Sequence, residues 1–153
     1  MERIQVYADG GCRGNQSEEN LGAWGFTMSY KGKILEKAEI EENTTNNKQE
    51  LMAVIKVLEH IKTTQIPIDI HVDSAYVYNG MSSWIFGWKK KNWRSSSNKP
   101  VKNVDLWKKL DALANKQSDI CWVKVDGHKD NEGNNRADLL VNEAMDRFLK
   151  GDV

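Results

Sequence analysis

Apolar residues alternate with other types from Ile4 to Ala8, which is the two-residue period of a β-strand. The glycines after Asp9 predict that this strand ends there, with Asp9 at its C-terminal tip. Residues 22–30 and 33–41 have the pattern of two further strands around a Lys-Gly turn. The first three strands should therefore form an antiparallel meander.

The hydrophobic period then becomes helical. Apolar residues recur every three or four positions from Lys48 to Lys62, with Asn46 and Asn47 before them as possible N-caps. A β-branched run over residues 66–72 follows and ends at Asp73. A strand that follows a helix most simply lies parallel to the first strand, through a right-handed crossover.

The second half of the chain repeats these signals. Helical spacing is expected from Ala75 to about Ser82, then over 104–116 and again over 135–149, with a strand over 121–125. These elements predict an α/β fold with a five-stranded mixed sheet, in which strands 1, 2 and 3 are antiparallel and strands 4 and 5 are parallel, flanked by helices. The length of 153 residues fits one domain, residues 1–153.

Composition narrows the class of protein. No stretch approaches the ~20 apolar residues of a membrane span, and the N-terminus lacks the features of a secretory signal. Cys12 and Cys121 have no C-x-x-C spacing, so reduced thiols are expected. A cytoplasmic protein without a membrane partner is therefore expected.

The formal net charge of zero conceals an asymmetry. Residues 84–102 hold six basic residues and no acidic one, so the rest of the chain has six more acidic than basic residues. One face should be basic and another acidic. Because Lys and Arg side chains supply much of the affinity for nucleic acid, the basic segment can bind a polyanion despite the neutral total.

Four carboxylates fall at places where such a sheet could bring them together: Asp9, Glu50, Asp73 and Asp138. Functional groups gather outside the carboxyl ends of strands in open α/β sheets, and a cluster of acids there requires a hard cation. Oxygen ligands without Cys or His suit Mg²⁺ or Mn²⁺.

Each carboxylate also has a structural explanation. Glu50 could be the capping-box partner of Asn47, and Asp138 could complement a helix dipole in the first turn of the last helix. Asp9 and Asp73 could be turn residues at strand ends.

Five segments resemble, in order and spacing, the signature of the type 1 ribonuclease H family. They are Asp9-Gly10-Gly11-Cys12-Arg13-Gly14-Asn15, Thr44-Thr45-Asn46-Asn47-Lys48-Gln49-Glu50-Leu51, Val72-Asp73-Ser74-Ala75-Tyr76-Val77, the Trp- and Lys-rich stretch from Trp84 to Trp107, and Gly127-His128 followed by Asp138. The resemblance spans about residues 3–148. It implies a ribonuclease H-like fold with a basic helical protrusion at about 84–103.

The resemblance also implies an activity, which is endonucleolytic hydrolysis of the RNA strand of RNA–DNA hybrids, leaving 5′-phosphate and 3′-hydroxyl ends. Two Mg²⁺ ions, or Mn²⁺ as a substitute, would be shared by the four carboxylates. In the family pattern Asp9 bridges both ions, Glu50 and Asp73 complete one site, and Asp138 helps to hold the other. His128 would assist proton transfer or product release.

The substrate would be held by two sets of residues in this resemblance. The backbone of the Gly11-Cys12 turn, the side chain of Asn46 and the carboxylate of Glu50 would probe 2′-hydroxyls, with Asn15 and Asn47 contacting the hybrid close by. Ser74 would also bind the substrate, and a pocket would rest mainly on Thr45 and Asn103. The DNA strand would meet the protrusion through Trp84, Trp88, Lys89, Lys90, Lys91 and Arg94. Trp107 has helical spacing with Leu110 and is expected in the core.

Four positions depart from the family pattern. Ala75 replaces a glutamine that reaches the minor groove and Ser29 an arginine that holds a DNA phosphate, which would weaken binding. Asn135 replaces a glutamate near the second metal, which would either loosen that metal or shift the preference toward Mn²⁺, and Asp126 replaces a lysine.

Two other functions fit the same residues. One is another nuclease or strand-transfer enzyme of this fold, and the other is a non-catalytic hybrid-binding module that needs only the basic segment. A monomer without an obligate protein partner is expected in each case.

Overall fold

The computed structural model describes residues 1–14, 20–126 and 131–151. Its centre is one five-stranded sheet with the strand order β3-β2-β1-β4-β5. The strands are β1 (Ile4–Arg13), β2 (Leu21–Tyr30), β3 (Lys33–Glu42), β4 (Ile68–Val72) and β5 (Ile120–Lys124). β1, β2 and β3 pair antiparallel, whereas β4 lies parallel to β1 and to β5, so the predicted mixed sheet is confirmed.

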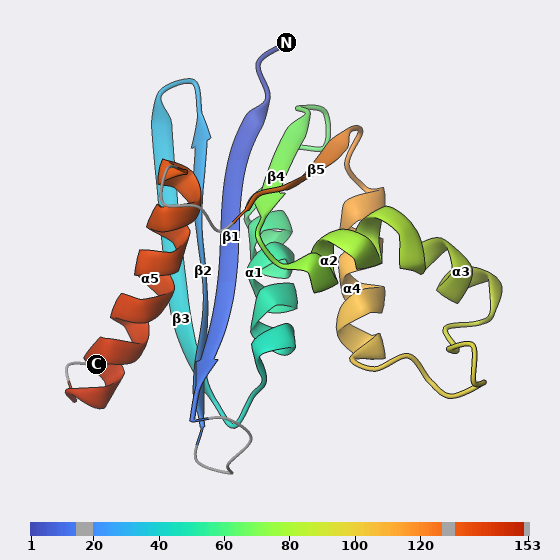
Figure 1. Cartoon of the computed structure of the whole chain (residues 1–153). Helices are drawn as coiled ribbons and strands as arrows, with labels where there is room; N and C mark the ends of the chain where they lie inside the picture. The colour runs from blue at the N-terminus through green and yellow to red at the C-terminus, as the bar shows by residue number, and fades with distance from the viewer. Residues whose placement is uncertain (15–19, 127–130, 152–153) are drawn as a thin grey trace.

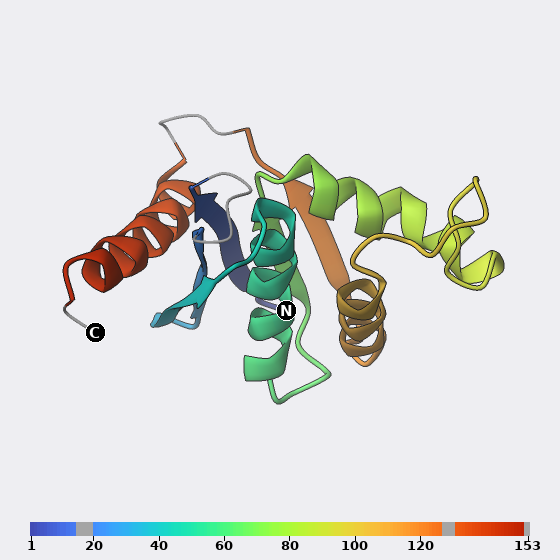
Figure 2. The same ribbon diagram turned by 90° about the horizontal axis from the view of Figure 1, so that it is seen from below.

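Helices cover the sheet on both sides, as Figure 1 shows. They are α1 (Asn46–His60), α2 (Ala75–Asn79), the π-helical turn η1 (Gly80–Trp84), α3 (Ile85–Lys90), α4 (Val104–Asn115) and α5 (Glu132–Leu149). α5 lies alone on one face, and α1 and α4 lie on the other; Figure 2 shows the same layers from below. None of the described helices is long and apolar enough to cross a membrane.

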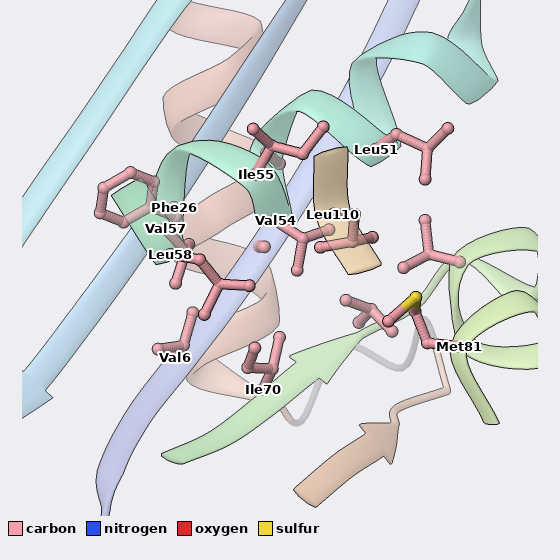
Figure 3. Packing of buried hydrophobic residues seen from close by; sticks show 14 of the residues in the cluster. Val6, Phe26, Leu51, Val54, Ile55, Val57, Leu58, Ile70, Met81 and Leu110 are labelled. Carbon is pink, nitrogen blue, oxygen red and sulfur yellow. The ribbon is translucent and has the colours of Figure 1, made fainter. Parts of the chain in front are cut away.

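The main core fills the space between the sheet and α1. Val6 from β1 and Ile70 from β4 meet the inner stripe of α1, and Leu110 of α4 closes the cluster, as Figure 3 shows. These side chains are fully buried. Removing such a side chain from water contributes about 1.5–3 kcal/mol, so this layer holds β1, β4 and α1 in fixed relation.

A smaller cluster joins α5 to the other face of the sheet. Val141 and Met145 of α5 pack against Leu21 and Ala23 of β2. The predicted inner stripe of this helix is confirmed at Val141 and also at Ala137, which is fully buried. Each face of the sheet therefore carries one helix that brings functional residues toward β1.

Two helical segments differ in extent from the sequence prediction by three residues or more. The helical segment that begins at Ala75 does not stop near Ser82 but continues through η1 and α3 to Lys90. The last helix begins at Glu132 rather than Asn135, because the Asn131 side chain caps it by accepting the N–H of Asn134 at 2.9 Å.

Candidate active site

Three carboxylates meet where β1 and β4 separate. Parallel pairing between these strands ends at Ala8 and Val72, so Asp9 and Asp73 are the next residue on each chain segment. Glu50 comes from the N-terminal part of α1, which packs on β1. Oxygen atoms of the three side chains lie within 4.8 Å of one another. The structure thus brings together three of the four carboxylates that the sequence singled out.

The prediction that β1 ends at Asp9 is wrong, because the strand continues to Arg13 and its glycines pair with β2. Gly10 serves a close approach rather than a turn. A Cβ at Gly10 would lie 2.3 Å from the carbonyl carbon of Gln49 and 2.4 Å from the backbone nitrogen of Glu50. The backbone of α1 therefore rests directly on β1, which places Glu50 beside Asp9.

Hydrogen bonds fix the Glu50 carboxylate in this position. The Gly10 backbone N–H donates to Glu50 Oε1 at 2.6 Å, and the Ser74 hydroxyl donates to the same carboxylate. Because Glu50 reaches β1 in this way, the capping-box explanation with Asn47 is wrong.

The N-cap of α1 also differs from the prediction. Thr45 is the cap, and its hydroxyl accepts the Lys48 N–H at 3.1 Å. Asn46 and Asn47 are the first two residues of the helix, so both predictions of an N-cap there are wrong. Their exposed side chains are left facing the site rather than the helix end.

The carboxylate cluster is electrostatically strained without a cation. Asp9 is 6% exposed and Glu50 is 8% exposed. Burial, together with the charges of Glu50 and Asp73, raises the pKa of Asp9. Burial and the charge of Asp73 also raise the pKa of Glu50, although the Gly10 N–H opposes this effect. Three charges in so small a space are unfavourable unless an opposite charge joins them.

A hard divalent cation fits this donor set. The cluster offers carboxylate oxygens alone, with no His or Cys among its three described members. Oxygen ligands of this kind are those that Mg²⁺ and Mn²⁺ prefer. A cation there would also relieve the repulsion that raises the two pKa values.

Asp138 lies at the edge of the same site. It is exposed on α5 and lines a hollow of about 330 Å³ with Asp9, Glu50 and Asp73, but it is not in the tight group of three. Because α5 starts at Glu132, Asp138 lies nearly two turns into the helix, and its predicted place in the first turn is wrong. The explanation that Asp138 complements the helix dipole is therefore also wrong, since the dipole effect fades beyond the first turn.

A second hollow of about 410 Å³ adjoins the first. Its lining residues are Cys12, Asn20, Thr44, Thr45, Asn46, Asn47, Lys102 and Asn103. The sequence predicted a pocket based on Thr45 and Asn103, and the structure brings both there. Cys12 and Asn46 line both hollows, so they lie between the carboxylates and the second pocket.

Sequence reasoning assigned no site role to three residues of this pocket, which are Asn20, Thr44 and Lys102. Thr44 appeared only within a segment that resembles the family. Lys102 was counted only as part of the basic segment, although its place beside Asn103 was a usable signal. Asn20 gave no signal, since nothing in the sequence shows that its side chain is buried against Thr44.

The residues Gly11 and Cys12 do not form the expected turn. They pair with Ala23 and Gly22 inside the β1–β2 ladder. Their position at the hollow is as expected, because both line it. Ser74 caps α2 by accepting the Val77 N–H at 3.2 Å, so its hydroxyl serves the helix as well as Glu50.

The protrusion is built on indole rings that pack at steep angles to one another. Trp88 lies 5.9 Å from Trp84, with the rings tilted, and 5.1 Å from Trp107, edge to face, between ring centroids. Trp107 is fully buried, as predicted, while Trp84 is 42% exposed. The buried rings thus support one exposed aromatic surface.

The lysines of the protrusion are exposed but not equivalent. Lys89 forms an ion pair with Asp111 at 3.1 Å. Lys90 and Lys91 lie at the exposed end of α3. Because Asp111 neutralises part of its charge, Lys89 offers less to a phosphate than its neighbours do.

Some predicted residues cannot be placed. Asn15 and His128 lie outside the described residues. Among the departures from the family pattern, Ala75 is the exposed first residue of α2, and Ser29 pairs with Gln5, four positions along β2 from the partner of Asp9.

Comparison with known sequences gives a consistent result. The RNase H family model matches residues 1–146. Ribonuclease H of Ruthia magnifica subsp. Calyptogena magnifica is 46% identical over 148 residues, which is 97% of this chain and 99% of the relative. Ribonuclease H of Methylobacillus flagellatus is 47% identical over 150 residues, which is 98% of this chain and 96% of the relative.

Solved structures agree with the sequences. LC9-RNase H1 superposes with a TM-score of 0.80 at 30% identity, covering 92% of this chain and 71% of that one. LC11-RNase H1, solved in complex with an RNA/DNA hybrid, superposes with a TM-score of 0.71 at 23% identity, covering 96% and 99%. At the lower identity the likeness extends to the fold alone.

Proposed function

This chain belongs to the ribonuclease H family, whose members cut the RNA strand of RNA–DNA hybrids, and we propose that the cluster of Asp9, Glu50 and Asp73 performs that hydrolysis. The observation that carries the proposal is the convergence of three carboxylates, two of them buried, within 4.8 Å. Such a cluster destabilises the fold, and ionisable groups with pKa values perturbed in this way gather at functional sites.

The family uses divalent metal ions, and the oxygen donors present here fit them. Asp9, Glu50, Asp73 and Asp138 would hold two Mg²⁺ ions, with Mn²⁺ as a substitute. When bound, the ions would supply an activated water and stabilise the leaving 3′ oxygen, which gives 5′-phosphate and 3′-hydroxyl ends. Asn135, one turn before Asp138 on α5, supports a preference for Mn²⁺ at the second site.

The chain's own groups would orient the hybrid. Asn46 and the backbone of Gly11 and Cys12 adjoin the carboxylates and are placed to contact 2′-hydroxyls. Thr45 and Asn103 would hold a phosphate in the second hollow, where Lys102 adds a positive charge. The substrate would thus be fixed on both sides of the scissile bond.

The protrusion would hold the DNA strand. Trp84 offers an exposed ring to a sugar, and Lys90 and Lys91 offer charges to phosphates. Arg94, whose guanidinium donates to the Asn98 carbonyl at 3.3 Å, supports the loop beyond α3. His128 would move a proton during hydrolysis or product release.

A non-catalytic hybrid-binding module is the second candidate. The basic protrusion alone would serve it, but such a module has no need of a buried acidic cluster. A strand-transfer enzyme of the same fold is the third, and the combination of Glu50 on α1 with the protrusion favours ribonuclease H.

We also propose that the protein acts as a monomer in the cytoplasm. All four carboxylates come from one chain, so the site needs no second copy. Cys12 and Cys121 are both free thiols, which fits a reducing compartment. Size-exclusion chromatography with light scattering tests the oligomeric state.

The deciding experiment compares matched RNA–DNA, RNA–RNA and DNA–DNA duplexes with Mg²⁺, Mn²⁺ or EDTA. Cleavage should be confined to the RNA of the hybrid and should require a metal. With the RNA labelled at its 3′ end, a shift in the gel mobility of the downstream product after phosphatase treatment identifies its 5′-phosphate. Hybrid binding without cleavage in either metal would instead support the binding module.

A further inference from the structure

A buried polar network lies under the start of α1. Asn20 is 7% exposed, Thr44 is 3% exposed and Gln49 is fully buried. Buried polar side chains are costly unless they are hydrogen-bonded, so a network of three at one place calls for an explanation. The ribonuclease H resemblance assigns no role to Asn20, Thr44 or Gln49.

Asn20 holds the backbone of Thr44 with both ends of its amide. Asn20 Nδ2 donates to the Thr44 carbonyl at 2.8 Å, and Asn20 Oδ1 accepts the Thr44 N–H at 2.8 Å. The reverse orientation would oppose donor to donor and acceptor to acceptor, so the partners determine how the amide lies. The backbone carbonyl of Asn20 also accepts the backbone N–H of Asn43 at 3.0 Å.

Gln49 holds the side chain of Thr44. Its Nε2 donates to Thr44 Oγ1 at 2.8 Å. The glycine Gly22 leaves room for the pair, since a Cβ there would lie 2.4 Å from Thr44 Cγ2 and 3.0 Å from Gln49 Cγ. Thr44 is therefore fixed at its N–H, its carbonyl and its hydroxyl, against the backbone of β2.

The segment fixed in this way leads directly to Asn46. Thr45 is the exposed cap of α1, and Asn46 is the next residue, lying between the two hollows of the site. Selectivity by hydrogen bonding requires a probe that cannot move to another partner when its own is missing. The buried network supplies that rigidity from beneath.

We propose that Asn20, Thr44 and Gln49 are positioning residues that set the discrimination between RNA and DNA by holding Asn46 at the 2′-hydroxyl. This inference rests on the proposed hydrolysis of the RNA strand and deepens it. None of the three touches the carboxylates, so their effect should fall on the choice of sugar more than on the chemistry.

The test uses two hybrids that differ only in the number of ribonucleotides, four or one, within a DNA strand. The ratio of kcat/KM for the two measures discrimination. Gln49→Met keeps the volume and removes both the hydrogen bond and the Gln49 Oε1 atom, which has no partner among the described residues. Asn20→Ala removes both bonds to the Thr44 backbone, and Thr44→Ser keeps the hydroxyl that Gln49 needs.

Asp69→Asn is the matched control, because it weakens a polar network with Arg3 and Gln5 at the opposite end of β4 from Asp73. Gln49→Met loses one hydrogen bond and should lower the kcat/KM ratio about two- to tenfold. Asn20→Ala loses two and should lower the ratio further. Thr44→Ser should stay near wild type. Asp69→Asn should lower Tm without changing the ratio.

A kcat/KM ratio that is unchanged in Gln49→Met, and in Asn20→Ala where that variant folds, would overturn the inference and leave the proposed function intact. An equal fall of the ratio in Asp69→Asn would also overturn the inference, as would a wild type that cuts both hybrids at the same rate. A wild type that cuts no hybrid would overturn the proposed function as well. Should Asn20→Ala fail to fold, Gln49→Met decides the matter.

Discussion

Asp9 is buried beside two other carboxylates, so its charge would serve the proposed metal site while it opposes folding. We expect Asp9→Asn to abolish cleavage while leaving the fold and hybrid binding largely intact, because it removes an oxygen ligand without emptying the core. Cleavage rates and Kd for a hybrid check this. Activity above about a tenth of wild type would contradict a role for Asp9 in holding the metal.

The same variant should change the stability of the metal-free protein in a pH-dependent way. Burial raises the pKa of Asp9 to about 10 from 3.8, so the fold favours the protonated form. The contribution of Asp9 to the free energy of unfolding is therefore fully present below its pKa in the unfolded chain. It is lost as pH rises toward its pKa in the fold, by at most about 1.4 kcal/mol per pH unit. Asp9→Asn removes this loss.

Thermal unfolding in EDTA tests the sign of this effect. The Tm of Asp9→Asn should exceed that of wild type, by a margin that grows from about pH 5 to about pH 9. Mg²⁺ or Mn²⁺ should then raise the Tm of wild type more than that of the variant. A margin that shrinks with rising pH would mean that the carboxylates do not repel one another in the fold.

At this scale the sequence predicted which acids come together but not how they are held. The order and spacing of Asp9, Glu50 and Asp73, within segments that resemble the family, were enough to single them out. The hydrogen bond from Gly10 to Glu50 and the burial of Asn20 depend on how α1 rests on the sheet. No local pattern in the chain records that contact.

The contact between α1 and β1 depends on the absence of a side chain at Gly10. Gly10→Ala would place a methyl group 2.3 Å from the backbone of Gln49, and backbone cannot yield as a side chain tip can. We expect a loss of about 1–3 kcal/mol or more in the free energy of unfolding, and a fall in activity as Glu50 moves. Denaturant unfolding and kcat measure the two.

Gly87→Ala in α3 is the control for this substitution, since a Cβ there would meet no atom within 4 Å. It should stabilise the protein by up to about 1 kcal/mol, because alanine favours the helix. Similar stability changes in the two variants would show that the close approach at Gly10 is unimportant.

The protrusion should act on binding rather than on chemistry. Replacing Lys89, Lys90 and Lys91 together by alanine should raise KM far more than it lowers kcat, because phosphate contacts hold ground and transition states alike. A plot of log Kd against log salt should lose up to about one unit of slope per contact. Since Lys89 pairs with Asp111, its single variant should change the slope least.

If the slope of log Kd against log salt is unchanged in the triple variant, the protrusion does not contact the substrate. A fall in kcat without a rise in KM would lead to the same conclusion. The Asp111→Asn variant is a useful companion, because it frees Lys89 and should steepen the slope instead.

Elements were predictable where hydrophobic periodicity is strong, as in α1, β4 and α4. Their ends were not, because capping by Thr45 and Asn131 and the continuation of β1 through two glycines depend on neighbouring elements. The helical path from Ala75 to Lys90 also exceeded its prediction. There Gly80 lets the chain pass so close to Trp107 that a Cβ would lie 2.0 Å from the ring.

Across the whole molecule, the basic protrusion and the acidic cluster come from different elements. The protrusion extends from one side of the sheet (Figure 2), whereas the clustered carboxylates come from β1, from α1 and from the residue after β4. We expect a hybrid that reaches both to pass the N-terminus of α1, where Asn46 begins the helix. The proposed sugar contacts would then lie between a region that attracts phosphate and one that repels it.

This arrangement predicts a need for several consecutive ribonucleotides and no cleavage of a DNA duplex. Two or three lost hydrogen bonds of about 0.5–1.5 kcal/mol each should slow cleavage by roughly one to three powers of ten. Because Ala75 cannot reach the minor groove, the sugar contacts carry more of the selectivity. Cleavage rates of wild type and Asn46→Ala on hybrids with one, two or four ribonucleotides measure this requirement. Equal rates of wild type on all three hybrids would contradict it.

The pairing of β4 with β1 also sets an order in which the chain can fold. It joins residues far apart in sequence, such as Gln5 and Asp69, which are 64 positions apart. Closing so long a loop is slow, whereas the β1-β2-β3 meander forms from near neighbours. We therefore expect Asp73 to reach Asp9 and Glu50 late, when much apolar surface is already buried. That step would bring like charges together, and we expect a divalent cation present at that moment to speed it.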